Sequence, residues 1–219
     1  MLRLLGHPLS NFYAIAKAAL LEKGLDFAAE RAVPSQDPVF LATSPLGRIP
    51  VLATPEGFLT ETIAILGYLE ELAPTPSLFP GTPYERACVR RLCHLVELGL
   101  DLPLRPFLAA RLGGPAPAEP LAERSRQELA RNAAGIARLA RFSPWVVGEA
   151  FSAADLYLHY CLGMSAPVAR QALGFDLEEA LGVPARWREA VAARPAVQAV
   201  DREHRAALER RFGARGGGA

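Results

Sequence analysis

The chain has 219 residues, of which 51% are hydrophobic, and its 24 basic and 23 acidic side chains give a formal charge of +1. This length is sufficient for a buried core in one or two domains, and the balanced charge gives no reason to expect nucleic acid or an anionic membrane as a partner. No stretch approaches the roughly 18 apolar residues of a spanning helix, and the N-terminus lacks the regions of a signal peptide. We therefore expect a cytoplasmic protein.

The cysteines and histidines give no sign of a metal or redox centre. Cys88, Cys93 and Cys161 are too few for a disulfide framework, and none forms the two-residue-spaced pair of a redox or zinc motif. The four histidines have no metal-ligand spacing. We expect no metal, and the missing cysteine pair argues against a thiol-disulfide oxidoreductase.

The N-terminal part of the chain alternates strands and helices. A strand over residues 2–5, a helix from Ser10 to Gly24 and a strand over 27–33 predict a β-α-β unit. After a polar loop, two short strands flank a turn at 54–57, and a helix starts at Thr62. This order predicts a mixed four-stranded sheet with helices packed on it.

Residues 44–52 read Ser-Pro-Leu-Gly-Arg-Ile-Pro-Val-Leu. Proline cannot donate to a β-ladder, so Pro50 marks the beginning of a strand. If the Ile49–Pro50 bond is cis, the N–H and C=O of Ile49 face outward and could pair with an extended peptide ligand. The alternative is an ordinary trans proline in a hairpin.

Thr60, Glu61 and Thr62 precede an apolar helical pattern. Thr60 or Thr62 can cap this helix. Because a helix start presents free N–H groups and a positive dipole end, the Thr62 hydroxyl and backbone amides could hold a ligand carboxylate, with Glu61 meeting a ligand ammonium. The alternative is a plain N-cap. Together with Ile49, this pattern favours a small peptide ligand.

The second half of the chain is predicted to be helical. Residues 73–83 hold four prolines and one glycine, and the alternation of strand and helix stops there. Helical spacing runs over 84–112 and 121–142, a Ser-x-x-Asp capping box at 152–155 opens another helix, and further helices begin at Pro184 and end near residue 211. We expect domains over 1–75 and 84–213, a linker at 76–83 and a flexible tail at 214–219.

Five motifs of the chain carry a family resemblance. The motifs at 5–10, 21–25, 44–52, 60–62 and 151–156 resemble those of cytosolic glutathione S-transferases, in the same order and over nearly the whole chain. The resemblance, to serine-type bacterial members, implies a thioredoxin-like N-terminal domain, an α-helical bundle as C-terminal domain, glutathione as cosubstrate and a homodimer. The capping box is then a structural feature.

The resemblance implies a role for each motif residue. In this family the residue before the proline, here Ile49 ahead of Pro50, forms backbone hydrogen bonds with the cysteinyl part of glutathione. The acidic-hydroxyl pair that holds the γ-glutamyl group is Glu61 and Thr62. Arg48 could meet the glycyl carboxylate. The alternative, about equally compatible with this position, is an arginine that contacts only solvent.

The resemblance places Ser10 where many members have a catalytic Ser or Cys. A free thiol has a pKa of about 8.5, so a hydroxyl that donates to the sulfur, with a helix N-terminus behind it, would favour the reactive thiolate. However, Asn11 stands where proline is frequent, and Ser10 could be only the N-cap. Asn11 or Tyr13 could also donate to the sulfur.

The implied function is a glutathione transferase that activates the glutathione thiolate for attack on a small, apolar electrophile. The alternative is a non-catalytic protein on the same fold that acts through protein contacts. The second substrate is expected between the domains. Its possible wall residues, which could instead be core, are Leu104, Phe107, Leu108, Arg111, Tyr157, Tyr160 and Met164.

Overall fold

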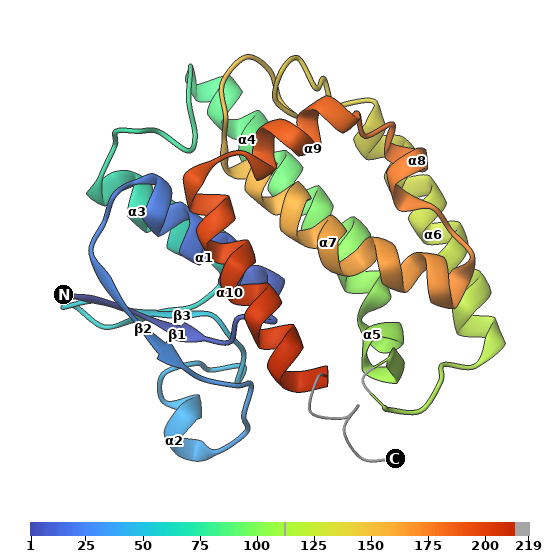
Figure 1. Ribbon diagram of the computed structural model, residues 1–219, viewed down its shortest axis with the longest axis horizontal. Helices are drawn as coiled ribbons and strands as arrows, with labels where there is room; N and C mark the ends of the chain where they lie inside the picture. Colours follow the sequence, from blue (N-terminus) through green and yellow to red (C-terminus); the bar gives the residue numbers. More distant parts are fainter. Residues whose placement is uncertain (112, 213–219) are drawn as a thin grey trace. The chain divides into compact units, whose positions relative to one another are not determined.

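The computed structural model describes residues 1–111 and 113–212, which pack into two units (Figure 1). One unit comprises residues 1–78 together with the segment from Ala192 onward, and the other comprises 79–191. This division falls inside the expected linker, but it groups the last helix with the N-terminal sheet rather than with the other helices. The expected domain boundaries stay a prediction, and the expected tail at 214–219 lies outside the described residues.

The first unit contains a mixed four-stranded sheet in the order β2-β1-β3-β4, as predicted. β1 pairs in parallel with β2 and antiparallel with β3, and β3 pairs antiparallel with β4. The strands are β1 (Leu2–Gly6), β2 (Phe27–Arg31), β3 (Val51–Ala53) and β4 (Phe58–Leu59).

The strand directions bring several connecting segments to one end of this sheet. Because β1, β2 and β4 run the same way and β3 runs against them, the ends of β1, β2 and β4 lie beside the start of β3. The register gives the pairs directly: Gly6 with Arg31, Leu5 with Val51, and Leu52 with Leu59. The segments after β1, after β2, before β3 and after β4 therefore meet at this end.

Four helices belong to the sheet-containing unit. They are α1 (Asn11–Glu22), α2 (Pro38–Leu41), α3 (Thr62–Leu72) and α10 (Pro195–Phe212). α1 packs against both α3 and α10, and these three lie together on one side of the strands in Figure 1. The short α2 was not predicted, although Asp37 caps it by accepting a hydrogen bond from the Val39 N–H at 2.8 Å.

Two long-range contacts hold α10 in place. The Arg194 guanidinium donates to both oxygens of Glu22 at the end of α1, at 2.7 and 2.5 Å. Further along α10, His204 Nδ1 donates to the Pro8 carbonyl oxygen at 2.8 Å. The C-terminal helix is thereby fixed to the loop that joins β1 to α1.

The second unit is helical, as predicted. Its elements are α4 (Pro83–Val96), a π-helical segment (Glu97–Asp101), a 3-10 turn (Leu102–Leu104), α5 (Arg105–Arg111), α6 (Glu119–Ala137), α7 (Ala153–Leu173), α8 (Leu177–Leu181) and α9 (Ala185–Ala192). Within the described ranges, no helix is both long and apolar enough to cross a lipid bilayer.

The helix expected over 84–112 is irregular in its middle. Pro103 has no N–H to donate to the Gly99 carbonyl one turn earlier. That carbonyl instead accepts a hydrogen bond from Asn132 Nδ2 at 3.0 Å. The π-helical and 3-10 segments lie where this proline interrupts the regular α-helical pattern.

The capping box at the start of α7 is confirmed. The buried Asp155 carboxylate accepts hydrogen bonds from the Ser152 N–H at 3.0 Å and from the Val146 N–H and Trp187 Nε1 at 2.8 Å each. Asp155 thus connects three segments of the helical unit, in keeping with a role in folding.

Candidate functional site

Ser10 is the N-cap of α1, directly after the loop that follows β1. Its Oγ accepts a hydrogen bond from the Tyr13 N–H at 3.3 Å. This capping bond uses a lone pair of the hydroxyl and leaves its proton available to a further acceptor. The observed N-cap and a donor role toward a ligand sulfur are therefore chemically compatible.

The two other candidate donors, Asn11 and Tyr13, are both buried. The Tyr13 ring packs on Gly6, where an added Cβ would come within 2.3 Å of Tyr13 Cδ2. The Tyr13 hydroxyl accepts a hydrogen bond from Lys17 Nζ at 3.5 Å. Burial raises the pKa of the Tyr13 phenol, against the lowering effect of the Lys17 ammonium, so that this hydroxyl stays protonated at neutral pH.

The turn before Pro50 is closed by Ser44 and Arg48. Ser44 Oγ accepts a hydrogen bond from the Arg48 N–H at 2.9 Å and donates one to the Arg48 carbonyl at 2.8 Å. Gly47 has a φ of +64°, and a Cβ there would lie 2.1 Å from the Ser35 carbonyl oxygen. Only glycine fits this position.

The Ile49–Pro50 peptide bond is cis, which was the condition for the binding hypothesis at this position. Pro50 is buried and the β3 register begins at Val51, opposite Leu5. Ile49 therefore precedes the ladder, at the end of the sheet where the β1–α1 loop begins. The neighbouring Arg48 side chain is exposed.

The predicted cap of α3 is wrong. Glu61, not Thr60 or Thr62, occupies the N-cap position, and no side chain caps this helix. Glu61 has a φ of +60° and a ψ of 111°, a conformation that costs a non-glycine residue about 1–3 kcal/mol and that clusters at ligand-binding sites. The Ala64 and Ile65 N–H groups donate to the Glu61 carbonyl at 2.9 and 3.0 Å, so the N–H groups left without an intrahelical acceptor are those of Thr62 and Ile63.

The topology collects these candidates at one end of the sheet. Ser10 follows β1, Ile49 precedes β3, and Glu61 follows β4, and these strand ends adjoin one another. α1, which starts at Ser10, also packs against α3, which starts at Thr62. This end of the sheet thus holds the exposed Glu61 carboxylate, the uncapped start of α3 and the Ser10 hydroxyl at the start of α1.

A cavity of about 730 Å³ opens at the same end of the sheet, on the β2 side. No motif in the sequence predicts this cavity. Its lining comes from the β1–α1 loop, the end of β2 and α10, and consists of Gly6, His7, Pro8, Leu9, Tyr13, Ala29, Glu30, Arg31, Val33, Glu203, Ala207, Arg210 and Arg211. No local sequence pattern indicates that the C-terminal helix returns to the N-terminal sheet.

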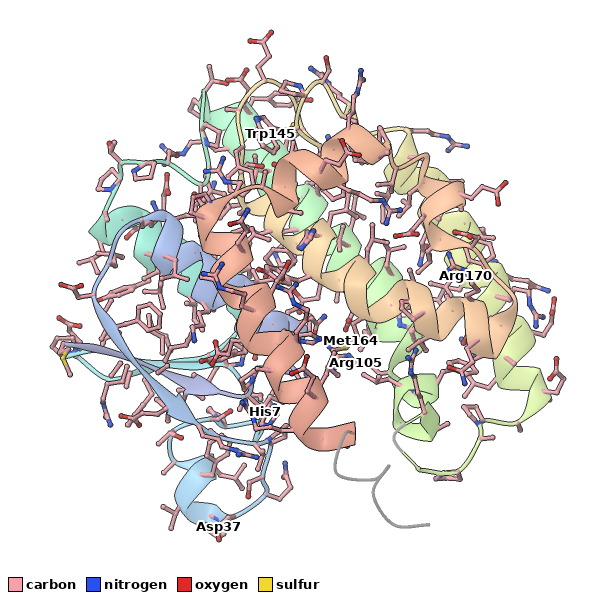
Figure 2. All side chains as sticks on the ribbon, in the orientation of Figure 1. His7, Asp37, Arg105, Trp145, Met164 and Arg170 are labelled. Atoms are coloured by element: carbon pink, nitrogen blue, oxygen red, sulfur yellow. The ribbon has the colours of Figure 1, made fainter. Side chains whose placement is uncertain are left out.

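The residues expected to line a second-substrate site differ in burial: Arg111 is exposed and Leu108 is half-buried. Leu104, Phe107 and Tyr157 are at most 3% exposed within the helical unit. Met164 and Arg105, which are labelled in Figure 2, border a hollow that has no room for a water molecule.

His7 lies in the cavity wall in a cationic environment. Its Nδ1 accepts a hydrogen bond from the Leu9 N–H at 3.1 Å, which places the proton of the neutral imidazole on Nε2. Burial lowers the pKa of His7, and the charges of Arg31, Arg211 and Arg210 lower it further, whereas Glu203 raises it. The imidazole is therefore neutral at physiological pH. Over residues 1–111 and 113–212, no cluster of three or more His, Cys, Asp or Glu side chains could hold a metal ion.

The sheet, its helices and the helical unit together define a thioredoxin-like fold followed by an α-helical region. The family model described as "Glutathione S-transferase, N-terminal domain" matches residues 4–77. A glutathione S-transferase of Pseudomonas putida is 38% identical over 176 residues, which cover 80% of each chain. The protein belongs to the glutathione S-transferase family.

Solved structures agree with this assignment. A glutathione S-transferase from Methylobacterium radiotolerans, in complex with glutathione sulfonate, is 28% identical, with a TM-score of 0.75 over 91% of this chain and 93% of that chain. One from Rhodospirillum rubrum is 29% identical, with a TM-score of 0.71 over 91% of each chain.

Proposed function

We propose that this protein is a glutathione transferase that converts bound glutathione to its thiolate and directs it at a small electrophile with an apolar body. The main observation in support is the start of α3, which no side chain caps and which directly follows the strained Glu61. It lies at the same end of the sheet as Ser10 and Ile49. A helix start that no side chain caps, beside an exposed carboxylate, suits the zwitterionic head of an amino acid.

The γ-glutamyl group of glutathione is assigned to the start of α3. Its carboxylate accepts from the Thr62 hydroxyl and the first N–H groups of the helix, and its ammonium meets the Glu61 carboxylate. Glu61 is exposed, so its carboxylate is accessible to a ligand ammonium, whereas Thr62 is only 6% exposed.

The rest of the tripeptide is assigned to the turn before β3. The N–H and C=O of Ile49, which precedes the ladder, pair with the cysteinyl backbone in the manner of an added strand. The exposed Arg48 guanidinium lies next to Ile49 in the chain and is assigned to the glycyl carboxylate.

Ser10 is assigned to thiolate stabilisation. Its hydroxyl donates to the sulfur while Oγ keeps the capping bond to Tyr13. Lowering the thiol pKa by about two units would stabilise the anion by roughly 2.7 kcal/mol and make it the main species near neutral pH. The thiol proton passes to water, and the sulfur then forms a C–S bond with the electrophile. In a substitution, a halide leaves with the bonding electrons. In an addition to an unsaturated carbonyl compound, the alkene π electrons move to the carbonyl oxygen.

The quaternary structure and location belong to the same proposal. We expect a cytoplasmic homodimer in which α3 and α4 meet their symmetry mates. Leu72 on α3 and Tyr84 on α4 are 49% and 74% exposed. Size-exclusion chromatography with light scattering tests this part, and a monomer at micromolar concentration would overturn it.

Calorimetric titration with glutathione, followed by a panel of electrophiles and peroxides, tests the catalytic proposal. We expect saturable glutathione binding and turnover with at least one electrophile. Binding without any turnover would favour the non-catalytic alternative. No glutathione binding would overturn the assignment of Ile49, Glu61 and Thr62.

A further inference from the structure

The 730 Å³ cavity shares the β1–α1 loop with the proposed glutathione site. Residues 6–9 line it, and Ser10 follows them directly. Pockets of 300–1,000 Å³ are typical for small organic ligands, by a rough general measure. Since β2 and β3 flank β1 on opposite sides, a molecule in the cavity would approach the loop from the side opposite to a tripeptide held at Ile49.

The cavity has an excess of positive charge. Its two acidic residues already face cations, because Glu30 forms an ion pair with Arg3 at 3.1 Å and Glu203 forms one with Lys17. The remaining charged residues of the lining are three arginines: Arg31, Arg210 and Arg211. Figure 2 shows His7 near the C-terminal turns of α10, which carry two of them.

The helix dipole alone does not explain why three arginines line this cavity. Cations in the last turn of a helix are favoured by its dipole, and Arg210 and Arg211 lie in the last turn of α10. Arg31, however, belongs to the end of β2 and lines the same cavity. Arginines from two separate elements thus line one cavity.

The other walls of the cavity are apolar. Pro8, Leu9, Val33 and Ala207 line it, and Val33 is 55% exposed. A ligand that matches the whole lining therefore has an apolar body and an acidic group. Guanidinium groups bind carboxylates by paired, charge-assisted hydrogen bonds. The arginines of the lining would therefore favour a carboxylate over an uncharged group.

We propose that this cavity receives the second substrate and that this substrate is an organic carboxylate, held by Arg31, Arg210 and Arg211 while its electrophilic carbon faces the loop that ends at Ser10. The proposal rests on the proposed transferase function, which it deepens by naming the substrate class. Burial is the main cause that lowers the pKa of His7, and the charges of Arg31, Arg211 and Arg210 lower it further.

A matched pair of electrophiles tests the proposal. Ethacrynic acid is an unsaturated ketone with a carboxylate, and its primary amide carries the same alkene without the charge. In both, the thiolate adds to the terminal alkene carbon, the π electrons move to the carbonyl oxygen, and the enolate takes a proton from water. For each electrophile, kcat/KM is divided by the rate constant of its uncatalysed reaction with glutathione, which corrects for intrinsic reactivity. The acid-to-amide ratio of these corrected values is then compared among variants.

We expect the wild-type protein to favour the acid. Because exposed charge pairs contribute little each, Arg31→Gln should lower the acid-to-amide ratio about fivefold, and the Arg210→Gln/Arg211→Gln double variant about tenfold. The matched control is Arg205→Gln, which removes an exposed arginine from α10 outside the cavity lining and should leave the ratio unchanged. The wild-type preference should also fall with added salt.

Two direct measurements keep the inference separate from the transferase proposal. The saturated, unreactive analogue of ethacrynic acid should bind more tightly than its amide by calorimetry, and the same arginine variants should abolish this difference. In NMR titrations, the saturated acid should raise the pKa of His7, because a bound carboxylate offsets the charges of Arg31, Arg210 and Arg211.

The outcomes can be told apart. Equal wild-type efficiency for acid and amide, or a ratio that the cavity variants leave unchanged, would overturn the inference while the transferase proposal stands. Tighter binding of the saturated acid, together with no turnover of any electrophile in the panel, would keep the anion site and contradict the transferase proposal. Circular dichroism and glutathione affinity confirm that each variant is folded.

Discussion

Lys23 and Glu70 form a buried ion pair, with Lys23 Nζ 2.7 Å from Glu70 Oε2 and the two side chains 0% and 3% exposed. Lys23 is the C-cap of α1, and Glu70 lies on α3. Lys23 Nζ also donates to the carbonyls of Ala73 and Pro76, at 2.7 and 2.9 Å. One ammonium thus holds the end of α1, the helix α3 and the segment that follows it together.

Replacing one partner of this pair should be costly. Lys23→Met leaves the Glu70 carboxylate buried without its cation, and we expect the free energy of unfolding to fall by about 3–5 kcal/mol. Urea denaturation measures this loss. Lys23→Met combined with Glu70→Leu should recover part of it, because the uncompensated charge is gone; a loss below about 1 kcal/mol in the single variant would contradict the prediction.

The same pair predicts a pH dependence of stability. Burial alone would raise the pKa of Glu70, but hydrogen bonds from Lys23, Ser77 and the Leu78 N–H together hold it below the usual value of 4.5. Because the folded-state pKa is lowered, the stabilisation is fully present above pH 4.5 and is lost as the pH falls through the folded-state pKa. Glu70→Gln should flatten the pH dependence of the free energy of unfolding in this acidic range. An unchanged slope would contradict the assignment of this dependence to Glu70.

Ser10→Ala should lower turnover much more than glutathione affinity. Loss of the hydroxyl donor raises the thiol pKa of bound glutathione, and we expect kcat at neutral pH to fall about tenfold or more while the calorimetric Kd changes little. The thiolate is followed by its ultraviolet absorbance as a function of pH.

Ser10→Thr is the control, because it keeps both the hydroxyl and the N-cap. Ser10→Ala also removes the cap, for which we expect a stability loss of about 1 kcal/mol. If Ser10→Ala shows unchanged activity and thiol pKa, the role moves to Asn11 or Tyr13.

Glu61 should show opposite effects on stability and binding. Glycine adopts positive φ without strain, so Glu61→Gly should raise the free energy of unfolding by up to about 1 kcal/mol and weaken glutathione binding. Glu61→Gln keeps the backbone strain and the side-chain size but loses the charge, so we expect weaker binding at nearly constant stability. Equal glutathione affinity in all three proteins would remove Glu61 from the site.

The sequence could predict the elements and the candidate site because both depend on local patterns. Caps, breakers and apolar spacing predicted α1, the 54–57 hairpin and α7, since each of these signals acts over a few residues. The cap of α3 was predicted wrongly, because a threonine at a helix start does not reveal the backbone conformation of Glu61. The Gly99 carbonyl that Pro103 leaves without a backbone donor is satisfied by Asn132, a residue of another helix, and this long-range contact has no local signal.

The sequence by itself thus determined the order of the four strands, the helical character of the second half and the motifs of the glutathione S-transferase family, because these depend on short, contiguous stretches. Only the tertiary structure decided where α10 lies and, with it, the cationic cavity. Arg31 and Arg210 are far apart in the chain and line one cavity because α10 packs on α1 and donates from His204 to Pro8. Such long-range packing has no local signature in the sequence.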